Sequence, residues 1–260
     1  MLSQLVLLMI KFFRKFRQRL LTENKFSKYL LYAVGEIILV VIGILIALQI
    51  NNWNEVQKNK AIEQQLLTSL LQEFETNLNI LSNTITTNTR IIESSINIGK
   101  FTGPTLPLIS EKELSQNMVG AFKYASRYTP NQGTYNEINN SGKLSLISDP
   151  SLRKAISELQ SQLKRVENQE NFVVERRDNA HQFFINNGNF RRHLDITDDA
   201  LIDVKPSNFP NNDFTFLEKQ EFESNLYLFI VTSKNLNRTF YIPLKEQTKL
   251  LIEQIRQNID

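Results

Sequence analysis

The sequence predicts an all-α protein, with a single N-terminal transmembrane helix followed by an antiparallel helical bundle with long helices. A 22-residue apolar stretch lies near the N-terminus, and apolar residues then recur every three or four positions through long proline-free segments. Little alternating pattern is present to indicate strands. We therefore expect a cytoplasmic basic tail at residues 1–28, a transmembrane helix at 29–50 and a helical-bundle domain at 51–260.

The apolar stretch runs from Tyr29 to Ile50, and at ~1.5 Å per residue it covers the roughly 30 Å of a bilayer core. It is longer than the apolar core of a secretory signal and ends without a small-residue cleavage site, so we expect it to be retained. Lys and Arg concentrated before the stretch place the N-terminus in the cytoplasm, with Trp53 as an anchor at the opposite interface.

The tail carries the basic character of the chain. Met1 to Lys28 holds seven Lys or Arg and one Glu, a net charge of +6, whereas the whole chain has +3. This distribution favours contact with anionic lipid headgroups and argues against a nucleic-acid-binding domain. We expect an interfacial helix whose basic and aromatic side chains touch lipid, namely Lys11, Phe12, Phe13, Arg14, Lys15, Phe16, Arg17 and Arg19. The alternative is a charged topology signal that needs no helix, and translation from Met1 or from Met9 stays open.

Glu36 is the only charged residue in the apolar stretch. At four-three spacing it shares one helix face with four other residues, which together form the α-helical seam Glu36, Val40, Gly43, Ala47 and Ile50. Gly43 and Ala47 form a small-xxx-small pair that allows two helices to approach closely, so the seam predicts a homo-oligomer. In one alternative, Glu36 lies at the level of the lipid headgroups and pairs with Lys28 or Arg19. In the other, a ring of Glu36 carboxylates forms an ion pathway.

Three helices are expected in the first part of the domain. Four-three spacing continues to about Gly99 and predicts one long helix, in continuity with the membrane stretch. A capping box at Ser110–Glu113 opens a second helix that should run to about Tyr128. A similar pattern at Thr134–Glu137 predicts a short third helix that stops at Gly142.

The longest helix of the domain should begin at Asp149-Pro150 and reach Gly188. Glu170 and Arg177 fall on its apolar seam, and we expect them to face water; the alternative is a buried pair that fixes the helix register. Residues 189–212 show no clear period and predict an irregular connection. Residues 217–260 are again helical, with a kink or division at Pro243.

The sequence offers little material for an active site. It has no Cys and only two His, and no glycines are spaced to cradle a phosphate, so we expect no enzyme, no cofactor and no catalytic or metal site. A cation at Asp195, Asp198 and Asp199 is the weaker alternative to helix capping. His181 and His193 are expected to be solvated or hydrogen-bonded.

The stretch from Ile10 to Glu55 closely resembles the opening of an uncharacterised family of single-pass envelope proteins common in Bacteroidota. The shared features are the basic-aromatic start, Gly-Glu-Ile at the entry to the span, and Gln-Ile-Asn-Asn-Trp-Asn at its exit. Residues 134–138 and 141–144 resemble the internal motif of the family, whereas residues 1–8 depart from its pattern. The resemblance implies a bacterial inner-membrane location and a periplasmic helical domain, and it brings no activity or cofactor.

The leading functional hypothesis is a non-enzymatic periplasmic bundle for protein–protein assembly or scaffolding, which self-associates through the Glu36 seam and binds an unidentified envelope protein. The alternative is a ligand-sensing or regulatory bundle that acts through a partner membrane protein, because the short tail leaves no room for an output domain.

Overall fold

The computed structural model describes residues 26–105, 109–197, 205–209 and 214–259. Within them the chain is helical and contains no strand, which confirms the all-α prediction. The chain divides into two compact units, Met1–Ala61 and Ile62–Asp260. The tail residues of the predicted lipid contact lie outside the described residues, and the topological boundaries at 28/29 and 50/51 stay predictions.

Helix α2 extends without interruption from Phe26 to Gly99 and belongs to both units. The predicted continuity between the apolar stretch and the first helix of the domain is therefore confirmed. The helix ends at Gly99, as the sequence predicts.

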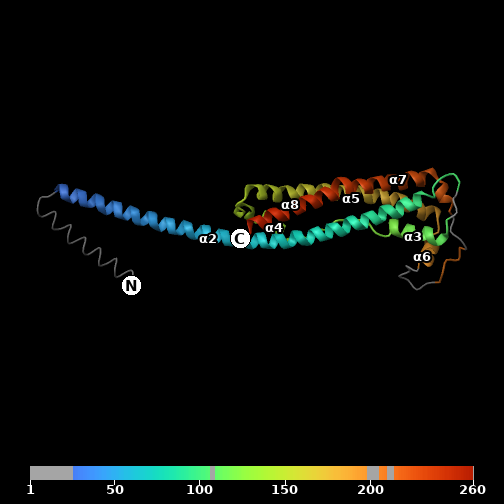
Figure 1. Ribbon diagram of the computed structural model, residues 1–260, viewed down its shortest axis with the longest axis horizontal. Helices are drawn as coiled ribbons and strands as arrows, with labels where there is room; N and C mark the ends of the chain where they lie inside the picture. Colours follow the sequence, from blue (N-terminus) through green and yellow to red (C-terminus); the bar gives the residue numbers. More distant parts are fainter. Residues whose placement is uncertain (1–25, 106–108, 198–204, 210–213, 260) are drawn as a thin grey trace. The chain divides into compact units, whose positions relative to one another are not determined.

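The second unit consists of the later part of α2 and the helices that follow it (Figure 1). These helices are α3 (Glu111–Phe122), α4 (Gly133–Asn140), α5 (Pro150–Asn187), α6 (Phe190–Thr197), α7 (Gln220–Asn235) and α8 (Ile242–Asn258). Short turns η1 (Lys143–Leu146) and η2 (Thr215–Glu218) precede α5 and α7, and the π-helical turn η3 (Leu236–Tyr241) joins α7 to α8.

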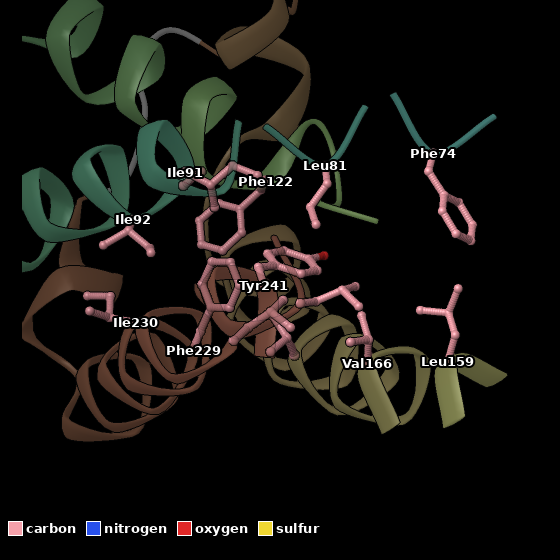
Figure 2. Packing of buried hydrophobic residues seen from close by; sticks show 14 of the residues in the cluster. Phe74, Leu81, Ile91, Ile92, Phe122, Leu159, Val166, Phe229, Ile230 and Tyr241 are labelled. Carbon is pink, nitrogen blue, oxygen red and sulfur yellow. The ribbon is translucent and has the colours of Figure 1, made fainter. Parts of the chain in front are cut away.

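The core of the second unit lies between α2, α5, α7 and α8, and α3 closes one end of it. Figure 2 shows Tyr241 in the middle of this core, with Phe122, Phe229 and Val166 around it. The rings of Phe122 and Phe229 stack with their centroids 6.0 Å apart. Side chains from distant parts of the chain thus share one continuous apolar interior, the main source of stability of a folded domain.

Two helix starts follow the predicted capping chemistry. The Ser110 hydroxyl accepts a hydrogen bond from the Glu113 backbone N–H at 3.1 Å, and α3 begins at the next residue. The Asp149 carboxylate accepts from the Ser151 backbone N–H at 2.8 Å, and Pro150 opens α5. Each cap satisfies a backbone donor that has no partner inside the helix, so both starts are confirmed.

The predicted end of α3 is wrong, because the helix stops at Phe122 rather than near Tyr128. The chain then continues in an irregular path whose backbone groups bind side chains of other helices. The Tyr128 N–H donates to Glu170 of α5, and Asn77 of α2 bonds both the N–H and the carbonyl of Asn131. These long-range partners replace the hydrogen bonds that further helical turns would supply.

The cap predicted for α4 is also wrong. The helix begins at Gly133, and the Glu73 carboxylate of α2 accepts from the backbone N–H groups of Thr134 and Tyr135, at 2.7 and 3.1 Å. Glu137 instead pairs with Lys143. A carboxylate at a helix N-terminus satisfies the free donors and interacts favourably with the helix dipole, so α4 is capped from another helix.

Two later predictions meet different outcomes. Residues 189–212 are not wholly irregular, because α6 forms from Phe190 to Thr197 after the Asn189 side chain accepts from the Arg192 N–H. The division at Pro243 is confirmed: the π-helical turn η3 ends immediately before α8, which begins at Ile242. Proline cannot donate the helical bond to the carbonyl four residues earlier, and a π-turn accommodates that loss.

Candidate functional sites

The first candidate site is the exposed apolar segment, residues 37–50 of α2. Every side chain in this segment is exposed, and its large apolar members Ile37 and Leu39 reach 63% and 65% exposure. Within the described residues, α2 contains the one helix stretch that is long and apolar enough to cross a membrane. Soluble proteins seldom expose so large a contiguous apolar surface, so the segment calls for an apolar environment outside the chain.

The predicted seam lies on this part of α2. Its five residues, Glu36, Val40, Gly43, Ala47 and Ile50, are all exposed and share one helix face by their four-three spacing. A Cβ atom added at Gly43 would have no neighbour within 4 Å. The contacts of the chain itself therefore do not require glycine at this position.

Trp53 follows the exposed apolar segment by one turn of α2 and is 64% exposed. Its indole ring is thus available to the surroundings, as an interfacial anchor requires.

A buried carboxylate, Glu170 of α5, forms the second candidate site. Its side chain is 3% exposed, so the prediction that it faces water is wrong. The same oxygen, Oε1, accepts from the Tyr241 hydroxyl at 2.6 Å and from the Tyr128 backbone N–H at 2.7 Å. Arg177 is not its partner, because that guanidinium pairs with Asp178 at 2.5 Å.

This Glu170 cluster (Glu170, Tyr241 and Tyr128) joins α5, the end of η3 and the irregular segment after α3. Burial raises the pKa of the Glu170 carboxyl, and the hydrogen bonds from Tyr241 and Tyr128 oppose that rise. Beside the cluster an open groove of about 650 Å³ runs between α5 and residues 128–132, with Gln160, Ser161 and Lys164 along it. The cluster therefore positions one wall of a surface groove.

The later part of α2 holds buried polar residues that the sequence analysis did not single out. Glu63 accepts from the N–H and hydroxyl of Ser148, at 2.6 and 2.8 Å. Asn88 donates to the Ser233 carbonyl and to the Asn237 side chain, both at 2.9 Å. Together with Glu73 and Asn77, these side chains fix loops and helix ends, and their positions among buried apolar residues of α2 are the signal that could have revealed them.

The third candidate site is a pocket of about 210 Å³ where α3, α5 and α6 meet, hereafter the histidine pocket. Both histidines of the chain line it, together with the apolar side chains Met118, Phe122, Phe184 and Phe190. His193 is buried, at 4% exposure, so it is not solvated. His181 stacks on Phe122 with centroids 5.2 Å apart and ring planes 7° from parallel.

The charge of His181 in the histidine pocket is influenced first by burial and then by one neighbouring cation. Burial and the nearby Arg177 lower the pKa of His181, which favours its neutral form. The ion pair between Arg192 of α6 and Glu111 of α3 connects two of the helices that build the pocket. No local pattern could predict this convergence, because His181 and His193 lie on different helices.

Of the three acidic residues proposed as the alternative metal site, Asp195 alone lies within the described residues. Asp195 pairs with Arg191 and accepts from the Ser207 N–H, whereas Asp198 and Asp199 lie outside the described residues. No group of three or more potential metal ligands among His, Asp and Glu occurs in the part of the chain that the structure describes.

Comparison with protein families gives a match over the middle of the chain. Residues 36–180, more than half of the chain, match the model of the Family of unknown function (DUF6090). No curated protein and no solved structure matches the chain. The matched residues include the exposed apolar segment, the Glu170 cluster except Tyr241, and the helices α3 and α4. The chain therefore belongs to the DUF6090 family, an uncharacterised domain family.

Proposed function

We propose that the chain is a non-enzymatic membrane-anchored protein whose helical domain serves protein–protein assembly or scaffolding. The observation that carries the proposal is the exposed apolar segment of α2, which no other part of the described chain covers. Leaving such a surface in water costs ~25 cal/mol per Å² of apolar area, whereas a bilayer core removes that cost.

The proposed location is a bacterial inner membrane, with residues 1–28 cytoplasmic and the domain at 51–260 periplasmic. Support comes from the net charge of +6 before the apolar stretch, since positively charged flanks stay in the cytoplasm. The resemblance of residues 10–55 to envelope proteins of Bacteroidota agrees with this orientation. Anionic lipid headgroups would contact the basic and aromatic residues of the tail.

An assembly role is supported by the hydrogen bonds that polar side chains of the domain make to distant segments. The buried Glu63 and Asn77 and the half-buried Glu73 hold loops and helix ends, and the buried Glu170 joins three segments. The domain is best interpreted as an antiparallel bundle, since Gln64 of α2 bonds the late residue Asn258, while Asn88 bonds the earlier Ser233. A rigid helical bundle with this internal bracing suits a scaffold.

Self-association through the Glu36 seam is part of the proposal. Gly43 is not required by packing within the chain, and with Ala47 it offers the small-xxx-small surface on which membrane helices associate. The carboxylate of Glu36, exposed in the single chain, would then face its counterparts in the assembled helices, where it needs a partner or a proton.

Disulfide crosslinking in native membranes tests the seam directly, because the chain contains no cysteine. Ala47→Cys places a thiol on the seam, and Leu45→Cys places one on the opposite face of the same helix. We expect oxidation to crosslink the Ala47→Cys chain into dimers and to leave the Leu45→Cys chain monomeric. Equal crosslinking of the two, or none, would remove self-association from the proposed function.

Gly43→Leu, combined with Ala47→Cys, sharpens this test by filling the seam. We expect it to abolish the crosslink, whereas Gly35→Leu, at an equally open glycine off the seam, should leave it intact.

The orientation of the chain in the membrane is tested separately with Lys58→Cys, which a membrane-impermeant maleimide should label in intact spheroplasts. Labelling only after lysis would contradict a periplasmic domain.

The alternative function, a ligand-sensing or regulatory bundle acting through a partner membrane protein, is favoured by one observation. The histidine pocket is a concave site at the junction of three helices, where a ligand would alter their packing. Co-purification from crosslinked membranes would identify an envelope partner in either case, and Glu36→Gln tests whether the seam contributes to its capture.

A further inference from the structure

The open groove of about 650 Å³ beside α5, hereafter the α5 groove, is a surface site that the proposed function has not used. One wall is the face of α5 between Ser157 and Glu170, and the other is the irregular segment 128–132. The segment is held in two places, because its Tyr128 N–H bonds Glu170 and a side chain of α2 bonds the N–H and carbonyl of Asn131. The two walls of the groove are therefore preformed, as is usual for binding sites.

The length of the α5 groove suits a linear chain. Residues 157–170 of α5 line it, and at ~1.5 Å per residue they extend over ~20 Å. An extended peptide rises ~3.3 Å per residue, so about six residues would cover this distance. A groove of this length that is open to solvent differs from the closed cavities that bury most of the surface of a compact small molecule.

Polar groups on both walls are available to a ligand. Gln160 lies on α5, and Thr129 and Gln132 lie on the irregular segment. Within the described residues, none of these three side chains has a hydrogen-bond partner. A glutamine amide carries a donor and an acceptor, the same pair that each peptide group presents. Hydrogen bonds to the main chain supply much of the affinity where proteins recognise extended peptides.

The charges of the α5 groove are already satisfied within the chain. Lys164 and Glu167 pair with each other, with 2.9 Å between Nζ and Oε2. The buried Glu170 accepts hydrogen bonds from Tyr128 and Tyr241. The described lining thus offers no unpaired charge to a ligand, and an uncharged ligand is the complementary one.

The distribution of apolar groups in the α5 groove fits a chain with two different faces. Tyr128, Pro130 and Leu163 are half-buried and form its apolar part. Ser157 and Ser161 are exposed and form part of its polar rim. Successive side chains of an extended peptide point to opposite sides, so an alternating apolar and polar sequence would satisfy both parts.

We propose that the α5 groove binds an extended, uncharged peptide segment of about six residues from a partner protein, with its main-chain amides between Gln160 and residues 129–132. The inference rests on the proposed assembly function, because a protein partner supplies the segment. It concerns the second unit alone and does not involve the Glu36 seam.

A fluorinated label provides a site-specific readout, because the chain has no cysteine of its own. A trifluoroethyl thiol label at Ser157→Cys reports on the α5 groove, and the same label at Arg165→Cys reports on an exposed position of α5 that does not line it. The probe is a mixture of capped hexapeptides in which Thr alternates with Ala, Val or Leu, added to the full chain in detergent micelles. We expect a saturable ¹⁹F shift at position 157 and none at position 165.

Three matched ligands separate the classes of recognition. The same peptides N-methylated at their central amides should bind at least about tenfold more weakly, because they lack main-chain donors. Peptides with Glu in place of Thr should also bind at least about tenfold more weakly, and the glycan chitohexaose should leave the signal unchanged. No saturable shift with the Thr peptides, equal binding of the N-methylated or Glu peptides, or equal binding of the glycan would overturn the proposal.

Gln160→Ala, combined with Ser157→Cys, tests the amide contact itself. It should weaken the Thr peptides about fivefold to tenfold, whereas Gln247→Ala, at an exposed glutamine of α8 outside the groove, should not change their binding. Equal effects of the two substitutions would count against the proposed contact. Disulfide crosslinking at Ala47→Cys reports self-association separately, so a failure of peptide binding with the crosslink intact removes the groove and leaves the assembly role standing.

Discussion

The two parts of α2 use the same helix in opposite ways. In residues 37–50 apolar side chains are exposed, and no side chain of this segment is buried. In residues 62–99 apolar side chains such as Leu67 and Leu81 are fully buried, and polar ones such as Asn77 and Asn88 are buried beside them. Helical geometry alone therefore does not decide what a side chain contacts.

The two parts of α2 differ in how strongly they depend on the identity of individual residues. The first part offers a uniform apolar surface, and a bilayer would accept many sequences of similar hydropathy there. The later part holds particular loops through particular polar groups, and a lost partner leaves a buried donor or acceptor unsatisfied. Substitutions in the later part should thus change the free energy of unfolding, whereas substitutions in the first part should change membrane insertion, and the two effects should differ in magnitude.

The largest effect is expected in the domain, at the Glu170 cluster. Glu170→Ala leaves the Tyr241 hydroxyl and the Tyr128 N–H without their acceptor, and it opens a cavity in the core. We expect the free energy of unfolding to fall by about 3–5 kcal/mol, measured by urea denaturation of the full chain in micelles.

Glu170→Gln is the matched control, because both hydrogen bonds use Oε1 and an amide oxygen can accept them. We expect a loss of no more than about 1 kcal/mol near neutral pH. Since burial raises the pKa of Glu170, the folded state binds the proton more tightly, and stability falls as pH rises from 4.5 through the folded pKa. Glu170→Gln should lack this pH dependence. An equal loss of unfolding free energy for Glu170→Ala and Glu170→Gln would contradict the assigned hydrogen bonds.

A smaller effect, in a different observable, is expected in the exposed apolar segment. Ile42→Lys places a charge in the middle of the segment and should reduce membrane insertion by about 2.5–3.5 kcal/mol. Alkaline extraction of membranes measures the inserted fraction. Gln57→Lys, also exposed on α2, should insert normally, and an unchanged Ile42→Lys chain would show that the segment does not lie in a bilayer core.

Asn77 of α2 holds the irregular segment at Asn131 through two hydrogen bonds. We therefore expect Asn77→Ala to lower the free energy of unfolding by about 2–3 kcal/mol. The substitution leaves both the N–H and the carbonyl of Asn131 without a partner. Asn83, exposed on the same helix, provides the control, and its replacement by Ala should change the free energy of unfolding by less than about 0.5 kcal/mol. Similar losses at the two asparagines would count against a bracing role.

The smallest effect should come from His181, through pH. Because its pKa is lowered in the folded state, the unfolded chain binds more protons below about pH 6.5. Stability should therefore fall as pH decreases through 6.5 toward the folded pKa. His181→Phe keeps a ring against Phe122 and should flatten this slope, as measured by thermal unfolding from pH 7.5 to 5.5. An unchanged slope would assign the pH dependence to other groups.

Features that depend on neighbouring residues could be predicted from the sequence alone. The apolar stretch, the continuity of α2 to Gly99, the caps at Ser110 and Asp149 and the division at Pro243 all follow from local chemistry. Helical periodicity, capping hydrogen bonds and the ring of proline act over a few residues, so a sequence pattern carries them directly.

Only the tertiary structure decided which distant groups meet. The end of α3, the cap of α4 by Glu73, the burial of Glu170 and the convergence of His181 with His193 depend on partners 42 or more residues away or on separate helices. A carboxylate or an imidazole looks the same in sequence whether it faces water or a buried donor. Its partner is fixed by how the helices pack, and that packing minimises exposed apolar surface and unsatisfied polar groups over the whole domain.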